Sequence, residues 1–350
     1  MTQTTLYASV LAKIGAERSK LLNETKIKAL AESRNLTELI TQLRDTGYQE
    51  QIAKLPLSLT SRKLERAFAE NLIDTFIKII KYSPKRARNY LSLYLLKFEI
   101  ENIKALIKAT SAKLSPDEKL SKIYFSVEDF LERRLFFDEA AKASTIIQII
   151  QSFKDTEYWA VLNMGLKGHE ESGSIACFDI FLDKYFFEKL YDSYESLVKK
   201  EQHYANFYAS IENDSFTLLT LLRGKALNFE PDQLRLLIPQ KNFNLSEPMI
   251  EALLSAMDFE AALKIVFESY YAKFFVEGQN PEEIIATARK TFNKTVFQYA
   301  KASRIGKIFN IGLPLAFMVQ REVEVHNLVA VALGVDSAMK VEDIRSQFLP

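Results

Sequence analysis

The sequence predicts an all-α protein made of three similar helical units. Three observations lead to this prediction. Apolar residues recur at helical spacing along most of the chain, glycine and proline are scarce, and two sets of landmarks recur about every 110 residues. A repeat close to a third of the chain indicates three units in a pseudo-threefold, funnel-like arrangement.

The first strongly periodic segment covers residues 64–80. Leu64, Phe68, Leu72, Phe76 and Ile80 follow one another at intervals of four. This spacing places them on one face of a helix, and neighbouring apolar residues widen that face. We therefore expect a long helix that packs against a second element.

Four further helices have recognisable first residues. In each, a capping residue is followed three positions later by Glu or Gln, a pattern that satisfies free backbone N–H groups. In three of the four, proline follows the capping residue and pre-sets the backbone for the first turn. The four pairs are Asn35 and Glu38, Ser115 and Glu118, Glu230 and Gln233, and Asn280 and Glu283.

The most glycine-rich piece, residues 165–173, is predicted to be an exposed loop. It contains Gly165, Gly168 and Gly173 within nine positions. No Asn-Gly or Asp-Gly pair occurs in the chain, and strict apolar alternation never persists, so no β-hairpin is expected.

The first repeated pattern is an acid followed by a polar residue three positions later. It occurs as Glu99 with Asn102, Asp214 with Thr217, and Glu324 with Asn327. A basic residue follows in the first two copies, Lys108 and Arg223, which are 115 positions apart. Leu333 holds the equivalent place in the third copy, 110 positions further on.

A second pattern repeats with a similar period. Thr46 and Tyr48 recur as Thr156 and Tyr158, 110 positions later, and more weakly as Ser269 and Tyr271, 113 positions beyond that. Two independent sets of landmarks with one period predict three units, at 1–118, 119–236 and 237–350. No flexible linker separates them, so we expect them to pack together rigidly.

The repeated acids have two interpretations that the residues leave open. Each carboxylate could cap or charge the first turn of its helix, where free N–H groups and the helix dipole favour negative charge. Alternatively, these helices could form part of a partner-binding surface. The candidate interface residues are Glu99, Asn102, Lys108, Asp214, Arg223, Glu324 and Asn327.

No catalytic, cofactor-binding or metal-binding residue is assigned. Gly224-Lys225 lacks the remaining glycines of a phosphate-binding loop, so direct nucleotide binding is not expected. His169, His203 and His326 are dispersed and lack the spacing of a zinc site. With 46 basic and 45 acidic residues, the net charge of +1 argues against nucleic acid as a partner.

The expected cellular location rests on three features that the sequence does not show: a disulfide pair, a membrane span and a secretory signal. The single Cys177 cannot form an internal disulfide and fits a reducing compartment. The longest apolar stretch, residues 311–319, is nine residues long, whereas a membrane span needs about 20. No secretory signal is expected at the N-terminus.

Together, these patterns resemble the central-stalk subunit that is called C in archaeal-type and d in vacuolar rotary ATPases. The acid–Asn frames carry the resemblance, along with residues 7–12, 39–48, 309–315 and 321–328, and it covers essentially the whole chain. Thr217 and Leu333 depart from the family pattern, which has Asn and a basic residue there. These departures weaken the prediction of partner contacts in every copy.

The resemblance implies a funnel-shaped rotor subunit without catalytic activity or a cofactor. In that family the shaft subunits, of D and F type, insert into the funnel mouth, and the base sits on the membrane proteolipid ring. The protein would thus be cytoplasmic and peripheral on the inner membrane face, and would couple the shaft to ion transport. A helical-repeat scaffold or adaptor is the alternative, and a helical enzyme is a third class. Neither the direction of ATP turnover nor the choice of proton or sodium follows from the residues.

Overall fold

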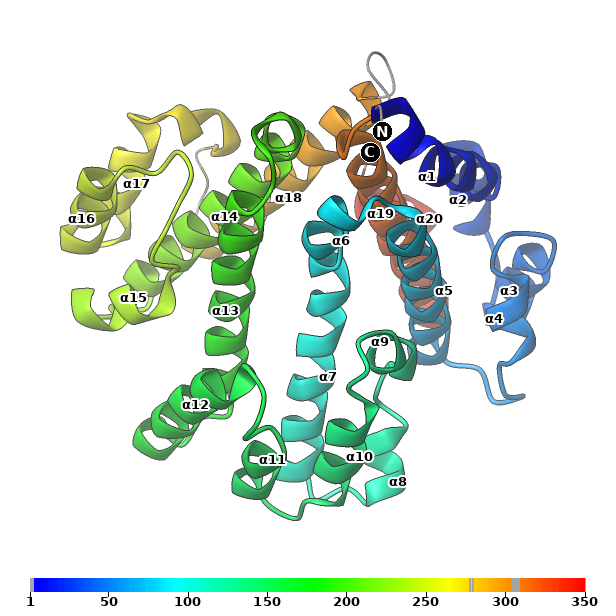
Figure 1. The fold of residues 1–350 in the computed structure, drawn as a ribbon, viewed down its shortest axis with the longest axis horizontal. Helices are drawn as coiled ribbons and strands as arrows, with labels where there is room; N and C mark the ends of the chain where they lie inside the picture. The colour runs from blue at the N-terminus through cyan, green and yellow to red at the C-terminus, as the bar shows by residue number, and fades with distance from the viewer. Residues whose placement is uncertain (1–2, 277, 279, 304–308, 350) are drawn as a thin grey trace. The chain divides into compact units, whose positions relative to one another are not determined.

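The computed structural model describes residues 3–276, 278, 280–303 and 309–349. This part of the chain contains twenty α-helices and one 3₁₀ helix and no strand, so the all-α prediction is confirmed (Figure 1). The helices are α1 Gln3–Arg18, α2 Glu24–Leu30, α3 Leu36–Leu43, α4 Gln49–Ala53, α5 Ser61–Tyr82, α6 Lys85–Leu91, α7 Leu93–Ser111, α8 Pro116–Leu120, α9 Phe125–Phe130, α10 Arg134–Lys142, α11 Ile146–Ser152, α12 Tyr158–Ser172, α13 Ala176–Glu195, α14 Lys199–Ala226, α15 Pro231–Leu237, α16 Glu247–Ser255, α17 Phe259–Phe267, η1 Tyr270–Phe274, α18 Pro281–Ala302, α19 Gly312–Asp336 and α20 Val341–Ser346.

The chain forms two compact units. The first consists of Met1–Leu91 and Asn293–Pro350, so it joins the two ends of the sequence, and the second is Ser92–Phe292. The division into repeats at residues 118 and 236 stays a prediction. The pseudo-threefold, funnel-like arrangement stays a prediction as well.

The first unit is organised around α5 and α19, which pack along each other, with α1 against both. The face predicted for residues 64–80 points into the core of this unit, because Leu64, Phe68 and Phe76 are completely buried. Helix α5 begins where Thr60 accepts a hydrogen bond from the Lys63 N–H. The apolar periodicity therefore predicted both the helix and its buried side.

The second unit is organised around α13, which packs against α7, α12 and α14. Short helices complete it: α8, α9 and α11 contact α7, and α15 and α17 contact α14. Aromatic side chains fill the core, among them Phe137, Phe153 and Tyr158, whose rings meet edge to face around Phe153.

The helix starts predicted from capping residues are confirmed. Asn35 accepts the Glu38 N–H at 2.9 Å, and Asn280 accepts the Glu283 N–H at the same distance. At α8, Ser115 and Glu118 cap each other's backbone N–H groups, and this satisfies two donors that the helix leaves free. The same exchange occurs at α15.

The prediction of a loop at residues 165–173 is wrong, because residues up to Ser172 belong to α12. Gly165 faces the ring of Phe178, and Gly168 faces the side chain of Cys177. A side chain at either glycine would collide with α13 or crowd it. These glycines therefore permit close helix packing, and only Gly173, with a φ of 71°, ends the helix in the left-handed conformation.

We expect Gly165→Ala to lower the free energy of unfolding by about 1–3 kcal/mol, because the new methyl group overpacks the interface with Phe178. The matched control is Gly15→Ala in α1, where the added methyl group meets nothing within 4 Å. That change should stabilise the protein by about 0.5–1 kcal/mol. Equal effects of the two substitutions in urea unfolding would contradict this packing.

The three helices that carry the repeated acids, α7, α14 and α19, end in the same way. Each is followed by a non-glycine residue with positive φ: Lys113 at 56°, Asn228 at 56° and Ala338 at 51°. The next N–H then bonds back to the helix, for example Met339 to the Gly334 carbonyl at 2.9 Å. This is the Schellman ending, which usually uses glycine. The backbone thus repeats with the same spacing as the sequence.

We expect Ala338→Gly to raise the free energy of unfolding by about 1 kcal/mol, since alanine is strained in the left-handed region and glycine is not. Asn228→Gly should gain less, because asparagine tolerates this conformation. As the reverse control, Gly173→Ala should destabilise the protein. A loss of melting temperature in Ala338→Gly would show that the backbone does not adopt this turn.

Candidate functional site

Five of the seven candidate interface residues are buried inside their units. Glu99, Asp214 and Glu324 are at most 4% exposed, and Asn102 and Asn327 are also buried. The acids lie within the long helices α7, α14 and α19 and not at their first turns. The capping interpretation is therefore wrong. Each helix begins at least six residues before its acid, at Leu93, Lys199 and Gly312.

In the first unit, Glu324 is held from three directions. The Tyr48 hydroxyl donates to Oε1 at 2.7 Å, and the backbone N–H of Leu22 donates to Oε2 at 3.2 Å. Arg321, one turn earlier on α19, donates to Oε1 at 2.6 Å. Burial raises the pKa of Glu324, while Arg321 and the hydrogen bonds oppose the rise.

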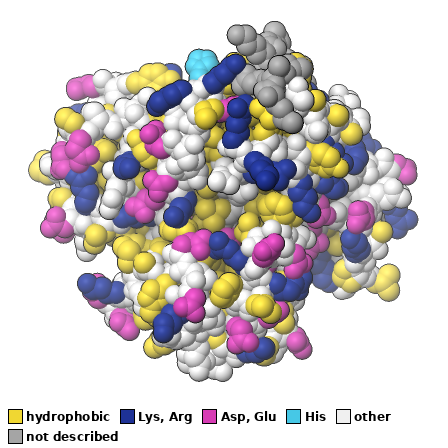
Figure 2. All heavy atoms as spheres, viewed as in Figure 1, with side chains coloured by type: hydrophobic (Ala, Val, Ile, Leu, Met, Phe, Trp, Pro, Cys, Tyr) yellow, Lys and Arg dark blue, Asp and Glu magenta, His cyan; other side chains and the backbone are white. Residues whose placement is uncertain are grey.

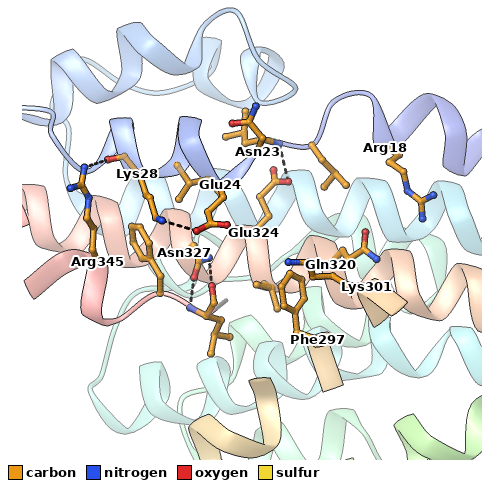
Figure 3. Close-up of a pocket in the computed structure, with 16 residues that line it drawn as sticks. Arg18, Asn23, Glu24, Lys28, Phe297, Lys301, Gln320, Glu324, Asn327 and Arg345 are labelled. Atoms are coloured by element: carbon orange, nitrogen blue, oxygen red, sulfur yellow. Dashed lines mark hydrogen bonds and ion pairs between the residues drawn. The ribbon is translucent and has the colours of Figure 1, made fainter. Parts of the chain in front are cut away.

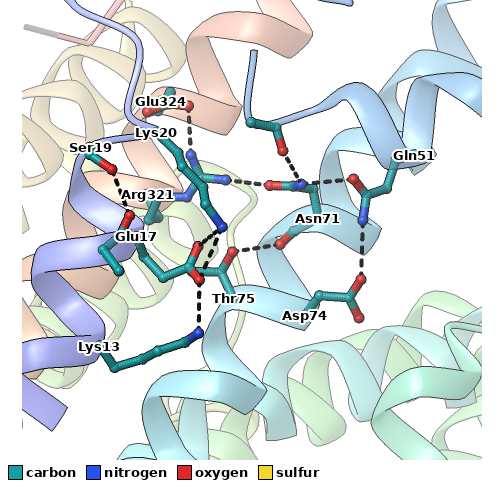
Figure 4. Close-up of polar contacts among 12 residues, drawn as sticks. Lys13, Glu17, Ser19, Lys20, Gln51, Asn71, Asp74, Thr75, Arg321 and Glu324 are labelled. Carbon is teal, nitrogen blue, oxygen red and sulfur yellow. Dashed lines mark hydrogen bonds and ion pairs between the residues drawn. The ribbon is translucent and has the colours of Figure 1, made fainter. Parts of the chain in front are cut away.

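Arg321 extends this site into a chain of polar contacts with α5. Its second guanidinium nitrogen donates to Asn71 Oδ1, and Asn71 Nδ2 donates to Gln51 Oε1 at 2.8 Å (Figure 4). Gln51 in turn donates to Asp74 at 3.1 Å. Polar groups that are buried together in this way fix the relative placement of α4, α5 and α19, because each lost partner would leave a buried group unsatisfied.

In the second unit, Glu99 on α7 also meets an arginine. Arg133 Nη1 donates to Glu99 at 3.0 Å, and Arg133 Nη2 donates to Glu157 at 2.6 Å. Tyr158 lies in the same pocket: burial and the charge of Glu99 raise the pKa of its hydroxyl well above the usual value. Burial likewise raises the pKa of Glu99, with Arg133 opposing the rise.

Asp214 on α14 is held by hydrogen bonds from backbone N–H groups and a tyrosine hydroxyl. The backbone N–H groups of Phe243 and Asn244 donate to its two oxygens at 2.9 and 2.8 Å. The hydroxyl of Tyr271 donates as well. Burial raises the pKa of Asp214, and these donors oppose the rise.

The two sets of sequence landmarks therefore meet in space. Each buried acid lies with a tyrosine of the second pattern: Glu324 with Tyr48, Glu99 with Tyr158, and Asp214 with Tyr271. In each case the hydroxyl of the Thr or Ser two residues earlier accepts the tyrosine N–H, at 3.3, 3.2 and 3.0 Å. We call the three groups the α7 module (residues 93–158), the α14 module (199–271) and the α19 module (312–349 with 21–48).

The polar residue three positions after each acid anchors a passing backbone segment. Asn102 accepts the Tyr124 N–H at 2.8 Å and donates to the carbonyl of the same residue. Asn327 makes the same pair of bonds with Leu349, at 2.8 and 2.9 Å. In the α14 module, Thr217 donates to Asn242 at 2.6 Å. The frame residues thus have a shared folding role.

The two repeated cations are the exposed members of the candidate set. Lys108 is half exposed and pairs with Asp179 at 2.8 Å. Arg223 is exposed, and partial burial together with the charge of Arg289 lowers its pKa. Leu333, at the third equivalent position, is 43% exposed. These three positions are the ones that a partner can reach.

Sequence reasoning missed the arginines and the backbone donors that neutralise the acids. Arg133 and Arg321 do not occupy equivalent places: Arg321 is on the same helix as its acid, whereas Arg133 precedes α10. No spacing in the sequence could reveal these partners, because a different set of residues neutralises the buried carboxylate in each copy. The Thr–x–Tyr pattern was the available signal, since it marks the residue that reaches each acid.

The surface carries charged side chains of both signs, interspersed over the face shown in Figure 2. Within the described residues, no group of three or more His, Cys, Asp or Glu side chains is placed to hold a metal ion. None of the described helices combines the length and apolar character that crossing a bilayer requires.

One hollow is well formed in the first unit. It has a volume of about 590 Å³ and lies between α2, α18, α19 and the C-terminal residues (Figure 3). Glu324 and Asn327 line one wall, while Ile27, Phe297 and Val323 supply apolar surface.

Comparison with known proteins gives a consistent result. The sequence profile of the ATP synthase (C/AC39) subunit family matches residues 10–347. The A-type ATP synthase C subunit of Methanocaldococcus jannaschii is 29% identical over 344 residues, which cover 97% of this chain and 85% of that protein. The proteins of the same name from Thermococcus kodakarensis and Methanosphaera stadtmanae are 24% and 26% identical. These matches cover 97% and 93% of this chain, and 90% and 83% of those proteins. The similarity extends through both units.

Proposed function

Because the chain belongs to the ATP synthase (C/AC39) subunit family, we propose that it is a non-catalytic central-stalk subunit of a rotary A-type or V-type ATPase. The observation that carries this proposal is the family match over residues 10–347, which leaves no room for an additional catalytic domain within the matched chain. Its role is mechanical: it transmits rotation between the soluble head and the membrane sector.

The partners follow from this role. The chain couples the shaft subunits, of D and F type, to the proteolipid ring, and it is held at the inner face of the membrane by the ring. The buried carboxylate sites support such a role because their arginines connect neighbouring elements: Arg321 joins α19 to α5 through Asn71, and Arg133 joins the start of α10 to Glu99 of α7. A rotor element that transmits torque needs this stiffness.

Within the candidate interface, we assign the direct contacts to the exposed positions. Lys108 and Arg223 present cations at equivalent places on α7 and α14, and Leu333 presents an apolar side chain on α19. The buried members, Glu99, Asn102, Asp214, Glu324 and Asn327, act indirectly by holding these helices. The unequal chemistry of the three exposed positions suits an asymmetric partner such as a shaft.

A helical-repeat scaffold or adaptor is the alternative function. The acid–tyrosine modules repeat at about 110 residues, whereas scaffold repeats span roughly 20–50 residues. The repeat length therefore favours the stalk role.

Co-purification tests the proposal. The chain would be affinity-tagged at its chromosomal locus and purified from detergent-solubilised membranes. It should co-purify with both the proteolipid and the shaft subunits in stoichiometric amounts. The double variant Lys108→Gln, Arg223→Gln serves as the interface control and should recover less shaft subunit, with only a small change in melting temperature, because the pair of Lys108 with Asp179 is partly exposed. Recovery of the chain without any ATPase subunit would contradict the stalk assignment and favour the adaptor.

A further inference from the structure

The hollow in the first unit lies beside Asn327 and Leu349 of the α19 module. Its walls come from the end of α1, residues 21–28, the second half of α18, α19 and the C-terminal residues (Figure 3). The α7 module offers an internal comparison, because Asn102 and Asn327 make the same two backbone bonds in the two modules.

In the α7 module, the corresponding space is filled by α9. The segment leaves Tyr124, which Asn102 holds, forms α9, and continues through Leu131 into α10; α9 packs against both α7 and α10. In the α19 module, Leu349 makes with Asn327 the bonds that Tyr124 makes with Asn102, and α2 precedes Thr46 and Tyr48 as α10 precedes Thr156 and Tyr158. Leu349 and Leu21 both line the hollow, and no helix of the described chain joins them.

The contacts of α9 in the α7 module indicate which side chains could bind in the hollow of the α19 module. Val127 and Glu128 of α9 are completely buried. Asn102 Nδ2 donates to the Tyr124 carbonyl and, at 2.6 Å, to Glu128 Oε1. Asn327 Nδ2 donates to the Leu349 carbonyl, the single acceptor it has among the described residues. One amide hydrogen of Asn327 is thus left for a carboxyl group at the equivalent place.

The other residues that line the hollow are suited to bind an apolar side chain next to an acidic one. Ile27, Phe297 and Val323 provide apolar walls, and the exposed Lys301 places positive charge at the edge of the hollow. Glu324 adds little opposing charge toward an occupant, since Arg321, Tyr48 and the Leu22 N–H already bind its oxygens.

We propose that this hollow is a docking site for a short helical segment of a partner subunit, with an adjacent apolar–acidic pair that enters as Val127 and Glu128 of α9 do. The identity of the partner as a subunit of the rotary ATPase rests on the proposed function. The chemistry that the hollow accepts is inferred separately, from the way the chain's own α9 is bound. Helices commonly bind in this way, with one apolar face inserted into a groove.

A synthetic peptide tests the site on the intact chain. The probe is a fluorescein-labelled peptide of residues 123–132, IYFSVEDFLE, with blocked ends, and binding is followed by fluorescence anisotropy at low salt. We expect saturable binding, weakened about tenfold or more when the peptide carries Val127→Asp. A scrambled peptide that binds as well as the native order would overturn the proposal.

Variants of the protein locate the binding. Val323→Trp fills the hollow, and Lys301→Glu reverses charge at its opening without altering a buried residue; each should weaken the peptide by about tenfold. Leu333→Trp, on the exposed side of α19, is the matched control and should leave affinity unchanged. Unchanged binding in both Val323→Trp and Lys301→Glu would mean that the peptide binds elsewhere, and the proposal fails.

Assembly tests the partner assignment separately. In a Cys177→Ser background, Leu21→Cys places one thiol in the wall of the hollow. Maleimide labelling of this thiol should be fast in the isolated protein and at least tenfold slower in the purified ATPase complex. Equal rates overturn the partner assignment. Failure to form any complex would instead contradict the stalk role, and the peptide measurement would then decide whether the site exists.

Discussion

Arg321→Met is expected to lower the free energy of unfolding by about 3–5 kcal/mol, the cost of removing one partner from a buried ion pair. Arg321 and Glu324 are each 4% exposed and lie 2.6 Å apart, so water cannot replace the lost partner. Methionine retains much of the apolar bulk, which confines the loss to the guanidinium. Asn71 would also lose the donor to its side-chain oxygen.

Two controls make this prediction specific. Tyr48→Phe removes one neutral donor from Glu324 and leaves Arg321 in place, so it should cost about 1–2 kcal/mol. Lys54→Met breaks the pair with Glu50 on the surface, where both side chains are more than half exposed, and should change stability by less than about 1 kcal/mol. If urea unfolding gave Arg321→Met and Lys54→Met the same small effect, Glu324 would not be buried.

Glu128→Gln is expected to change how stability depends on pH. Burial raises the pKa of Glu128 from 4.5 to about 8, with the charge of Glu99 adding to the rise, while Asn102 and Arg133 oppose it. The folded protein thus holds a proton on Glu128 at neutral pH that the unfolded chain releases. This contribution to stability is complete below pH 4.5 and is lost as the pH rises toward 8, at about 1.4 kcal/mol per pH unit.

Glutamine at position 128 is neutral at every pH and keeps an oxygen for the Asn102 side chain. The variant should therefore gain stability relative to the natural protein between pH 5 and pH 8, by on the order of 3 kcal/mol. Asp129→Asn is the neighbouring control: Asp129 is exposed and its pairing with Arg134 lowers its pKa, so this substitution should not produce the gain. A constant difference between Glu128→Gln and the natural protein across this range would show that Glu128 is ionised when buried.

The sequence predicted the helices better than it predicted their contacts. Apolar spacing identified α5, and capping residues identified the starts of α3, α8, α15 and α18. These signals are local, so a single stretch of sequence contains them. Gly165 and Gly168 of α12 led to the wrong prediction of a loop, because the reason for these glycines lies in another helix. They leave room for Phe178 and Cys177 of α13.

The repeated acids illustrate the same limit at the candidate site. Their spacing marked the right residues, and the Thr–x–Tyr pattern marked their partners, but neither indicated that the two sets meet. The pairing is not in simple order along the chain: Tyr48, near the N-terminus, reaches Glu324, near the C-terminus. Only the fold brings these segments together, and it places in buried internal contacts the acids that the sequence left open as helix caps or as part of a partner surface.

Ion pumping by the reconstituted ATPase shows whether the chain couples rotation without performing chemistry. Complexes would be assembled in lipid vesicles with and without the chain, and ATP hydrolysis and ion uptake would be measured on the same samples. We predict that removal of the chain abolishes ATP-driven ion uptake while the soluble head continues to hydrolyse ATP. Undiminished uptake without the chain, or loss of hydrolysis by the head alone, would show that the chain is not the coupling element.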